Sequence, residues 1–330
     1  MSIQSVYDLQ TPALLIDGEA LDHNLAVMSA ALPGRRLRPH VKAHKCTALA
    51  RRQVAVGHRS FTCATVREVE GMAAAGFGDD LLLANEVVDA RRLGGLDARV
   101  TVAVDSEATI VAAAAGGVRE VVIDVNVGLP RCGCAPEDAG RFADHARSNG
   151  LSVRGVMGYE GHVVGLEDRA TRARLTAEAM QLLLAAHAQV GGEMISAGGT
   201  GTYDCNTWAN EIQAGSYLLM DTAYAKLGLP FRQALSVLAT VISVARGYAV
   251  ADCGLKALGM DHGNPVVGDA QVLFCSDEHL TLVPEHALKV GDRIRVWPAH
   301  IDPTVAYHER MHLVSGDEVV DNYLVDLRGW

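Results

Sequence analysis

The chain has 330 residues, of which 49% are hydrophobic and 21% are charged. This composition is that of a folded globular protein with a substantial core, and it excludes a largely disordered chain. The formal net charge of −10 at pH 7 argues against a nucleic acid partner, because nucleic acid binding depends on clustered Lys and Arg side chains. Small metabolites are the expected partners.

The sequence also indicates in which compartment of the cell we expect the protein. The first ten residues lack a basic segment followed by an apolar one, so we expect no secretory signal. Apolar stretches end well before the roughly 18 residues that a membrane helix needs, so we expect no membrane span. These features favour a cytoplasmic protein whose seven cysteines are free thiols. Cys132 and Cys134 could hold a soft metal, but packed thiols are the simpler interpretation, because no second Cys or His pair lies near them.

Short aliphatic runs alternate with amphipathic segments through the first two-thirds of the chain, which is typical of β/α units and a parallel sheet. About eight such units favour a (β/α)₈ barrel of the TIM type over an open sheet. The expected strands are Ala13–Ile16, Leu37–Lys42, Ser60–Ala64, Leu81–Ala84, Val100–Val104, Glu120–Val125, Val153–Tyr159 and Met194–Ala197. The expected helices are Glu19–Leu32, Thr65–Ala75, Glu107–Ala115, Pro136–Ser148 and Asp168–Gln189.

Beyond about Leu235 the helical patterns stop and strand-like runs follow one another, separated by turns that contain Gly and Asp. These runs are Ser236–Val250, Gln271–Phe274, Leu280–Val283, Arg293–Trp297, Thr304–Leu313 and Glu318–Leu327. We therefore predict two domains: a barrel over residues 11–235, and a mainly β domain over residues 236–330 that also takes in residues 1–10.

The segment Leu37–Lys45 contains the strongest chemical signal. If the strand continues through it, the period of two places His40, Lys42 and His44 on one face. A lysine inside a barrel is costly unless it is paired or neutralised, and a Schiff base with an aldehyde cofactor removes that cost. The alternative is a basic strand end whose two lysines lie in solvent.

Two Gly-rich turns follow late strands of the predicted barrel. Ser196–Tyr203 contains Gly199, Thr200 and Gly201, and Gln213–Tyr217 supplies further Gly and hydroxyl donors. Glycines let backbone N–H groups approach an anion, and barrel enzymes often hold a phosphate after their last strands. A plain turn is the alternative for either segment.

Two further groups of residues suggest a site. His300 and Asp302 lie two residues apart, which in an extended segment would direct both side chains toward one metal ion. A histidine and a carboxylate favour Mn²⁺, Mg²⁺ or a similar ion, whereas a hydrogen-bonded His–Asp pair is the alternative. Arg131 lies in a Gly- and Pro-containing loop after a predicted strand, where it could bind a phenolate or carboxylate oxygen or lie on the surface.

In this order, the motifs resemble those of fold-type III pyridoxal phosphate enzymes, the alanine racemase-like group. The resemblance is greatest to the D-threonine aldolase and D-serine dehydratase family, and it extends from Thr11 to Gly329. The motifs are RPHVKAHK at 38–45, G-x-x-R-C-G at 128–133, GGTGT at 198–202, QAGSYLLMD at 213–221, ADCGLKALG at 251–259 and PAHIDPT at 298–304.

The resemblance implies a role for each candidate residue. Lys42 would bind the aldehyde of pyridoxal 5′-phosphate with His40 nearby, and Arg131 would face the phenolic oxygen of the cofactor. Gln213 would face the pyridine nitrogen, and Tyr159 and His162 would lie beside the ring or the substrate. The phosphate would be held by Gly199, Thr200 and Gly201 together with Gly215, Ser216 and Tyr217.

The resemblance also implies a reaction. Dehydratases of the family tend to carry His-x-Cys and bind zinc, whereas the aldolases tend to carry His-x-Asp and use manganese or a similar ion, so His300 and Asp302 favour the aldolase. We expect D-3-hydroxy amino acids to be cleaved to glycine and an aldehyde, with a D-serine or D-3-hydroxyaspartate dehydratase as the alternative. Family aldolases place a β-hydroxyl base where this chain has Gly165, and His162 is the substitute. A homodimer is expected.

Overall fold

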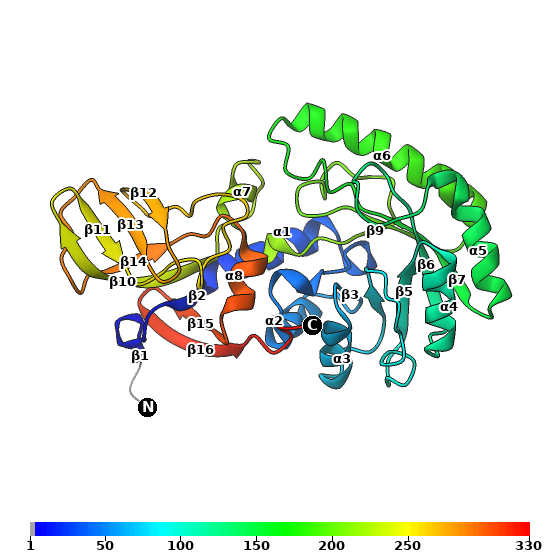
Figure 1. Ribbon diagram of the computed structural model, residues 1–330, viewed down its shortest axis with the longest axis horizontal. Coiled ribbons are helices and arrows are strands. Elements are labelled where there is room, and N and C mark those ends of the chain that lie inside the picture. The colour runs from blue at the N-terminus through cyan, green and yellow to red at the C-terminus, as the bar shows by residue number, and fades with distance from the viewer. Residues whose placement is uncertain (1–3) are drawn as a thin grey trace. The chain divides into compact units, whose positions relative to one another are not determined.

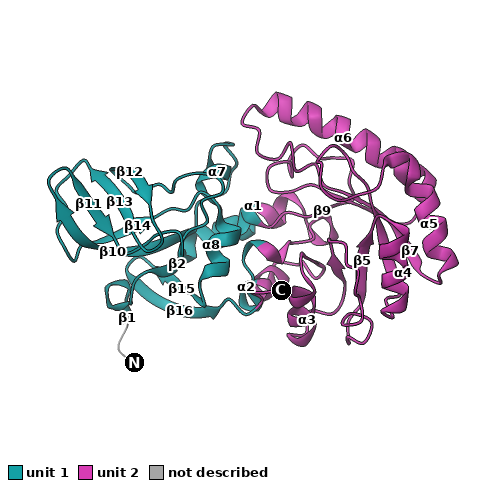
Figure 2. Ribbon diagram, viewed as in Figure 1, with its two compact units in different colours: residues 1–27, 43–49, 216–326 teal, residues 28–42, 50–215, 327–330 magenta. Residues whose placement is uncertain are grey.

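The computed structural model describes residues 4–330, and they divide into two compact units (Figure 2). Unit 1 holds the described residues up to Val27, together with Ala43–Leu49 and Ser216–Asp326. Unit 2 holds Met28–Lys42, Ala50–Gly215 and Leu327–Trp330. Among the described residues, none of the helices is long and apolar enough to cross a membrane.

Unit 2 is a parallel β barrel. Its sheet runs in chain order through seven strands: β3 (Phe61–Cys63), β4 (Leu81–Leu83), β5 (Val100–Val104), β6 (Glu120–Asp124), β7 (Ser152–Gly158), β8 (Met194–Ala197) and β9 (Glu211–Ile212). The extended segment 37–40 closes the ring, because Leu37 forms a parallel bridge with Ile212 and His40 forms one with Thr62. The predicted (β/α)₈ class is confirmed, with segment 37–40 as the eighth position.

Helices surround the strands as the amphipathic pattern predicted. They are α3 (Val66–Ala74), α4 (Glu107–Ala115), α5 (Ala139–Ser148) and α6 (Arg169–Val190), and α4, α5 and α6 lie outside the sheet in Figure 1. The Asp168 carboxylate caps α6 by accepting a hydrogen bond from the Thr171 N–H at 2.8 Å. The predicted helix Glu19–Leu32 is present as α1 (Gly18–Ala31). The predicted helix Pro136–Ser148 begins as the 3₁₀ turn Pro136–Asp138 and continues as α5, and α2 (Thr47–Ala55) follows residues 37–45.

Buried ion pairs occupy part of the barrel interior. The Arg38 guanidinium donates to Asp80 at 2.9 Å and to Glu211 at 2.8 Å, and Arg154 donates to the other oxygen of Asp80 at 2.7 Å. The pKa of Asp80 is raised by burial, but the two arginines outweigh burial and hold it well below its usual value. These charged side chains stand where aliphatic side chains would otherwise pack, and we call them the charged layer of the barrel: Arg38, Asp80, Arg154 and Glu211.

Unit 1 is built on a largely antiparallel sheet in the order β1, β16, β15, β2, β10, β11, β13, β12, with β14 paired to β10. The strands are β1 (Gln4–Ser5), β2 (Ala13–Asp17), β10 (Leu235–Ala245), β11 (Tyr248–Ala251), β12 (Ala270–Cys275), β13 (Leu280–Pro284), β14 (Arg293–Val296), β15 (Arg310–Ser315) and β16 (Glu318–Leu324). Two short helices, α7 (Thr222–Ala225) and α8 (Ile301–Tyr307), complete the unit. The predicted second, mainly β part is confirmed.

Three predicted elements in unit 1 were wrong in detail. Ala13–Ile16 is not the first barrel strand, because β2 pairs with β10 and β15. The run Ser236–Val250 is two strands joined by a turn at Gly247, whose φ is +93°. The start of Thr304–Leu313 is helical, because α8 covers it before β15 begins.

The two units interleave along the sequence, whereas we expected one boundary near residue 235 and a β domain that includes residues 1–10. Residues 1–3 lie outside the described part of the chain, and β1 pairs with β16 through Gln4 and Ser5. The domain limits 11–235 and 236–330 remain a prediction about which segments fold together.

Candidate active site

Lys42 lies just beyond the C-terminal end of segment 37–40. The segment does not continue as a strand, because Val41–Ala43 form a 3₁₀ turn. The alternation expected for His40, Lys42 and His44 is therefore wrong. Instead, the Lys42 N–H donates to His40 Nδ1 at 3.4 Å, and His40 is held in the barrel by its N–H, which donates to the Ala214 carbonyl at 3.2 Å.

Two cationic side chains flank one aromatic ring. Lys42 Nζ lies 5.9 Å from the ring centroid of Tyr159, and the Arg131 guanidinium carbon lies 5.5 Å from the same centroid. Tyr159 directly follows β7, and Arg131 lies in the loop after β6, so each stands at the C-terminal end of a barrel strand. The structure thus brings together three of the predicted site residues.

The first Gly-rich turn lies against this ring. A Cβ built on Gly199 would be 3.5 Å from Tyr159 Cε2, which places the turn beside the ring. A Cβ on Gly201 would lie 1.8 Å from the Val164 carbonyl oxygen, so only glycine fits there. Thr200 between them is buried. Gly198 has a φ of +80°, which glycine adopts without strain.

Gln213 is held by a hydrogen-bonded chain within the barrel. Its Nε2 donates to Ser196 Oγ at 2.9 Å, and that hydroxyl donates to Glu211 Oε1 at 2.6 Å. Glu211 also accepts a hydrogen bond from the Arg38 Nε–H. The Gln213 side-chain amide is therefore fixed by a hydrogen-bond network that ends on a buried guanidinium. The sequence predicted Gln213 but not the residues that orient it.

The residues after Gln213 divide between the units. Gly215 is the last residue of its unit 2 segment, and the buried Ser216 and Tyr217 open the 3₁₀ turn Ser216–Leu218 in unit 1. Tyr217 packs on Phe231, with the ring centroids 5.7 Å apart. Their predicted contact with a phosphate therefore stays a prediction.

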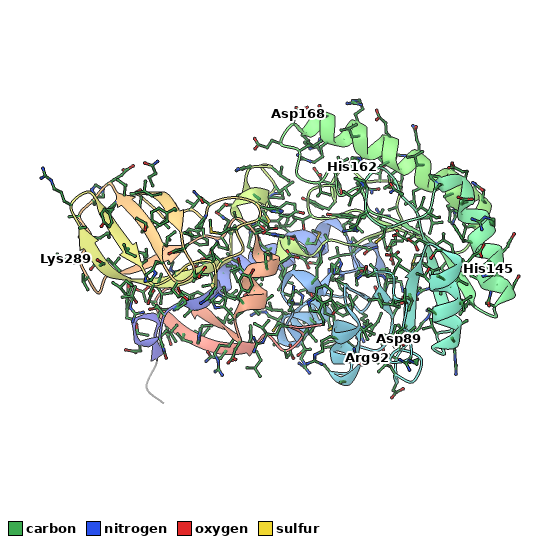
Figure 3. The ribbon with its side chains drawn as sticks, in the orientation of Figure 1. Asp89, Arg92, His145, His162, Asp168 and Lys289 are labelled. Atoms are coloured by element: carbon green, nitrogen blue, oxygen red, sulfur yellow. The ribbon has the colours of Figure 1, made fainter. Side chains whose placement is uncertain are left out.

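His162 lies in the loop between β7 and α6 and is exposed (Figure 3). A Cβ on Gly128, whose φ is +128°, would lie 2.7 Å from His162 Cε1. His162 therefore packs against the loop that carries Arg131. Gly165, three residues later, is also exposed, and a Cβ there would meet no atom within 4 Å.

A group of acids near Arg131 was not predicted. The pKa of Asp124, at the end of β6, is raised well above its usual value by burial and by Glu86, although Arg131 opposes this shift. A hydrogen bond with Glu86 raises the pKa of the Cys132 thiol to about 11, and burial raises that of Cys134 to about 12. Both cysteines are therefore protonated at neutral pH, as expected for packed thiols.

A second group of polar residues lies in unit 1 around His300. This residue occupies the N-cap position of α8, and Asp302 lies in the first turn of that helix, so the two residues do not lie in one extended segment as expected. The two side chains still meet, because His300 Nε2 lies 3.5 Å from Asp302 Oδ2. Asp261 Oδ2 lies 2.7 Å from the other ring nitrogen, His300 Nδ1.

Asp261 and His262 enlarge the candidate metal site beyond the predicted pair. The ligand atoms of Asp261, His262 and His300 all lie within 4.8 Å of one another, and the two imidazoles stack with centroids 3.9 Å apart. Burial lowers the pKa of His300, but Asp302 and Asp261 outweigh burial and raise it. A carboxylate on the second nitrogen of a metal-binding histidine fixes its tautomer and orientation. These residue types suit a divalent ion.

A buried carboxylate also connects the two short helices of unit 1. Asp221 accepts hydrogen bonds from the Tyr224 N–H at 2.9 Å and the Ile301 N–H at 3.2 Å. Burial raises the pKa of Asp221 to about 6, against the effect of these backbone donors. Asp221 therefore fixes the start of α8, where His300 and Asp302 lie.

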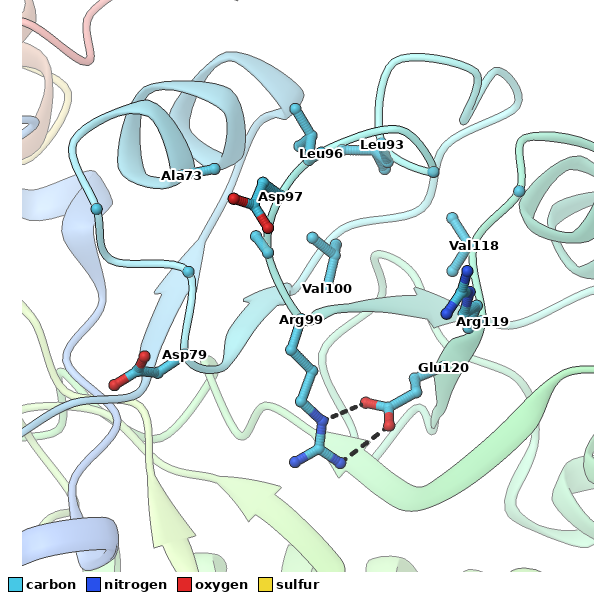
Figure 4. Close-up of a pocket in the computed structure, with 15 residues that line it drawn as sticks. Ala73, Asp79, Leu93, Leu96, Asp97, Arg99, Val100, Val118, Arg119 and Glu120 are labelled. Carbon is cyan, nitrogen blue, oxygen red and sulfur yellow. Dashed lines mark hydrogen bonds and ion pairs between the residues drawn. The ribbon is translucent and has the colours of Figure 1, made fainter.

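A hollow of about 780 Å³ lies elsewhere on the barrel (Figure 4). Its walls come from residues that precede β4, β5 and β6, and Arg99 and Glu120 pair across it at 2.8 Å. The N-terminal ends of parallel barrel strands lie opposite the ends that carry active sites. This hollow is therefore separate from the group around Lys42.

A barrel with these residues at its C-terminal end agrees with the comparisons to known families. The alanine racemase N-terminal domain matches residues 16–223, and a putative serine dehydratase domain matches residues 234–314. The chain therefore belongs to the alanine racemase-like family, within the group that adds a serine dehydratase-type domain and includes D-threonine aldolase.

Similar proteins include both aldolases and a dehydratase. A D-threonine aldolase from Arthrobacter sp. is 32% identical over 98% of this chain and 93% of the relative. The crystal structure of D-threonine aldolase from Filomicrobium marinum is 33% identical with a TM-score of 0.92, covering 100% of this chain and 99% of that one. D-threo-3-hydroxyaspartate dehydratase from Delftia sp. HT23 is 26% identical with a TM-score of 0.89, covering 99% and 100%.

Proposed function

We propose that this chain is a pyridoxal 5′-phosphate- and divalent metal-dependent lyase that cleaves D-3-hydroxy amino acids to glycine and an aldehyde. The observation that carries the proposal is the placement of Lys42 and Arg131 around the Tyr159 ring, beside the Gly199 turn. These groups fit pyridoxal 5′-phosphate. The amine can form a Schiff base with its aldehyde, the guanidinium can donate to an anionic oxygen, and the close-packed Gly turn can receive the phosphate.

The roles of the side chains follow from that fit. Lys42 would hold the cofactor aldehyde, with His40 beside its backbone, and the cofactor when bound would act as the electron sink. Arg131 would donate to an anionic oxygen, and Gln213 would direct its second amide N–H toward the ring nitrogen. Gly199, Thr200 and Gly201 would receive the phosphate, together with Gly215, Ser216 and Tyr217.

The metal would be held by His300 and Asp302. A bound divalent ion would orient the substrate β-hydroxyl and lower its pKa. Manganese fits a histidine and carboxylate set best, with Mg²⁺ and Zn²⁺ as the other candidates. His162 is the proposed base for the hydroxyl proton, since the neighbouring Gly165 has no side chain to supply one.

Two further features complete the proposal. The strands β10, β11 and β12 expose the apolar side chains of Ile242, Val244, Tyr248, Leu273 and Phe274. Such side chains suit contact with a second copy of the chain, so we propose a homodimer. The place of action is proposed to be the cytoplasm.

The cofactor is tested by reduction. Purified protein supplied with pyridoxal 5′-phosphate is expected to absorb in the yellow range, to lose that absorbance with borohydride and to give a labelled peptide containing Lys42. Lys42→Ala should lose the label, whereas Lys45→Ala should keep it. A label on another lysine would contradict the assignment.

The reaction is tested by its products. With D-threonine and Mn²⁺ we expect acetaldehyde and glycine, and little product from L-threonine. The second candidate, a dehydratase, is favoured by the serine dehydratase-type domain over residues 234–314. It would release 2-oxobutyrate and ammonia from D-threonine, or a 2-oxo acid from D-3-hydroxyaspartate, so the product identity decides between the two.

A further inference from the structure

Glu160 is a buried carboxylate that the sequence did not single out. It directly follows Tyr159 at the end of β7, and 0% of its surface is exposed. A buried carboxylate is costly unless hydrogen-bond donors surround it. The hydrogen-bond donors to Glu160 therefore show which part of the chain this carboxylate holds in place.

Three hydrogen-bond donors to Glu160 come from one loop, residues 198–206, which we call the Gly-rich loop. The Gly198 N–H donates to Glu160 Oε2 at 3.0 Å. The Thr202 hydroxyl and the Asn206 side-chain amide donate to Oε1 at 2.9 and 3.0 Å. The beginning, middle and end of the loop are thus tied to a single carboxylate.

The loop is also bonded to itself around these contacts. Thr202 Oγ accepts the Gly199 N–H at 3.2 Å, so the hydroxyl that donates to Glu160 also fixes Gly199. The Asn206 N–H donates to the Thr202 carbonyl at 2.8 Å. Glu160 therefore determines the backbone conformation of Gly199 and of the residues that follow it.

We propose that Glu160 is a positioning residue that holds the Gly-rich loop in the shape that receives a phosphate monoester. This inference rests on the proposed function, in which the loop binds the cofactor phosphate. Glu160 makes no contact with the phosphate in this proposal, because its two oxygens are directed at the loop donors. Its effect reaches the phosphate through Gly199, Thr200 and Gly201.

The test compares two aldehydes that differ only in the phosphate. Apoprotein is titrated with pyridoxal 5′-phosphate and with pyridoxal, and binding is followed by absorbance. Glu160→Gln keeps the size of the side chain but places an N–H₂ group against loop donors. We expect affinity for pyridoxal 5′-phosphate to fall about 10- to 100-fold, as for loss of hydrogen bonds to a charged group. Affinity for pyridoxal should change less than about threefold, because pyridoxal carries no phosphate for the Gly-rich loop to hold.

Matched variants separate this role from a general loss of structure. Thr202→Val removes one donor to Glu160 and should shift the affinity ratio of the two aldehydes in the same direction, whereas Thr202→Ser keeps the donor and should restore the ratio. Glu178→Gln is the control, because Glu178 is exposed on α6 and pairs with Arg174. Thermal unfolding of each variant checks that it is folded.

The outcomes are distinct. Equal weakening of both aldehydes, or no weakening, in folded Glu160→Gln would overturn the role of Glu160 while the wild-type protein still binds the cofactor. If the wild-type protein binds neither aldehyde at Lys42, the proposed function itself fails. In that case the phosphorus NMR spectrum of wild-type protein mixed with pyridoxal 5′-phosphate should also show only the signal of the free ligand.

Discussion

Individual residues near His300 show how far a short sequence spacing can be interpreted. His300 and Asp302 were predicted because they lie two residues apart, and their side chains do meet. Asp261 was missed because it precedes His300 by 39 positions, and only the folding of unit 1 brings it to the imidazole. Glu160 was missed for a similar reason, since its donors lie 38 to 46 residues later.

The contact between Asp261 and His300 leads to a prediction about metal binding. Asp261→Asn should weaken Mn²⁺ binding about 10- to 100-fold, because the ligand histidine loses the carboxylate that orients it. Isothermal titration of apoprotein with MnCl₂ measures the effect. Asp277→Asn changes an exposed acid in the same unit and should bind Mn²⁺ as the wild type does. Unchanged affinity in Asp261→Asn would show that His300 is oriented by other contacts.

At the scale of elements, the barrel helices and most of its strands could be predicted because their hydrophobic periods are regular. The segment around Lys42 could not, since alternation alone does not show where a strand ends. Here the segment forms a β-bridge at His40 and then turns through Val41–Ala43. The helix α8 was read as strand because it is only seven residues long and gives little helical period.

The packing of the Gly-rich loop on the β7–α6 loop gives a second prediction. Gly201→Ala would place a methyl group against the Val164 carbonyl, where the Cβ would lie at 1.8 Å. The backbone must shift, so we expect a loss of about 1–3 kcal/mol in the free energy of unfolding and weaker cofactor binding. Urea unfolding and cofactor titration measure the two effects.

Gly165→Ala is the matched control for that experiment, because a Cβ at Gly165 meets no atom within 4 Å. It should leave the free energy of unfolding within about 0.5 kcal/mol of the wild type. Equal stability of the Gly201 and Gly165 variants would mean that the two loops separate easily, which would also weaken the case for a preformed phosphate site.

At the scale of the whole molecule, the two-part architecture could be predicted but the path of the chain between its parts could not. β2 has the apolar sequence of a barrel strand and is followed by α1, as a β/α unit would be. Its partners are instead Leu235–Leu238 and Met311–Val314, which lie more than 200 residues further along the chain. A single strand pattern contains no information about which of two sheets it joins.

The charged layer of the barrel should make the stability of the whole fold depend on acid. Asp80 has a lowered pKa, so its contribution to folding is complete above the pKa of an unfolded Asp, about 3.9, and is lost as the pH falls through the lower folded value. The contribution of Asp80 to the free energy of unfolding should therefore be nearly constant from pH 7 to about pH 5 and should decrease below about pH 4, as the difference between the wild type and a variant without this carboxylate. Urea unfolding across this range measures it.

Asp80→Asn tests whether the acid dependence comes from this layer. Removing the charge leaves Arg38 and Arg154 buried without their shared carboxylate, which should cost about 3–5 kcal/mol at pH 7. The variant should also lose part of the decrease below pH 4, because the group that titrates there is gone. Asp79→Asn is the control, since Asp79 is exposed and lies 4.0 Å from an exposed Arg59. If the two variants have the same free energy of unfolding, Glu211, Glu120 and Glu193 are sufficient to neutralise the buried arginines. Asp80 would then not be the residue that stabilises the charged layer.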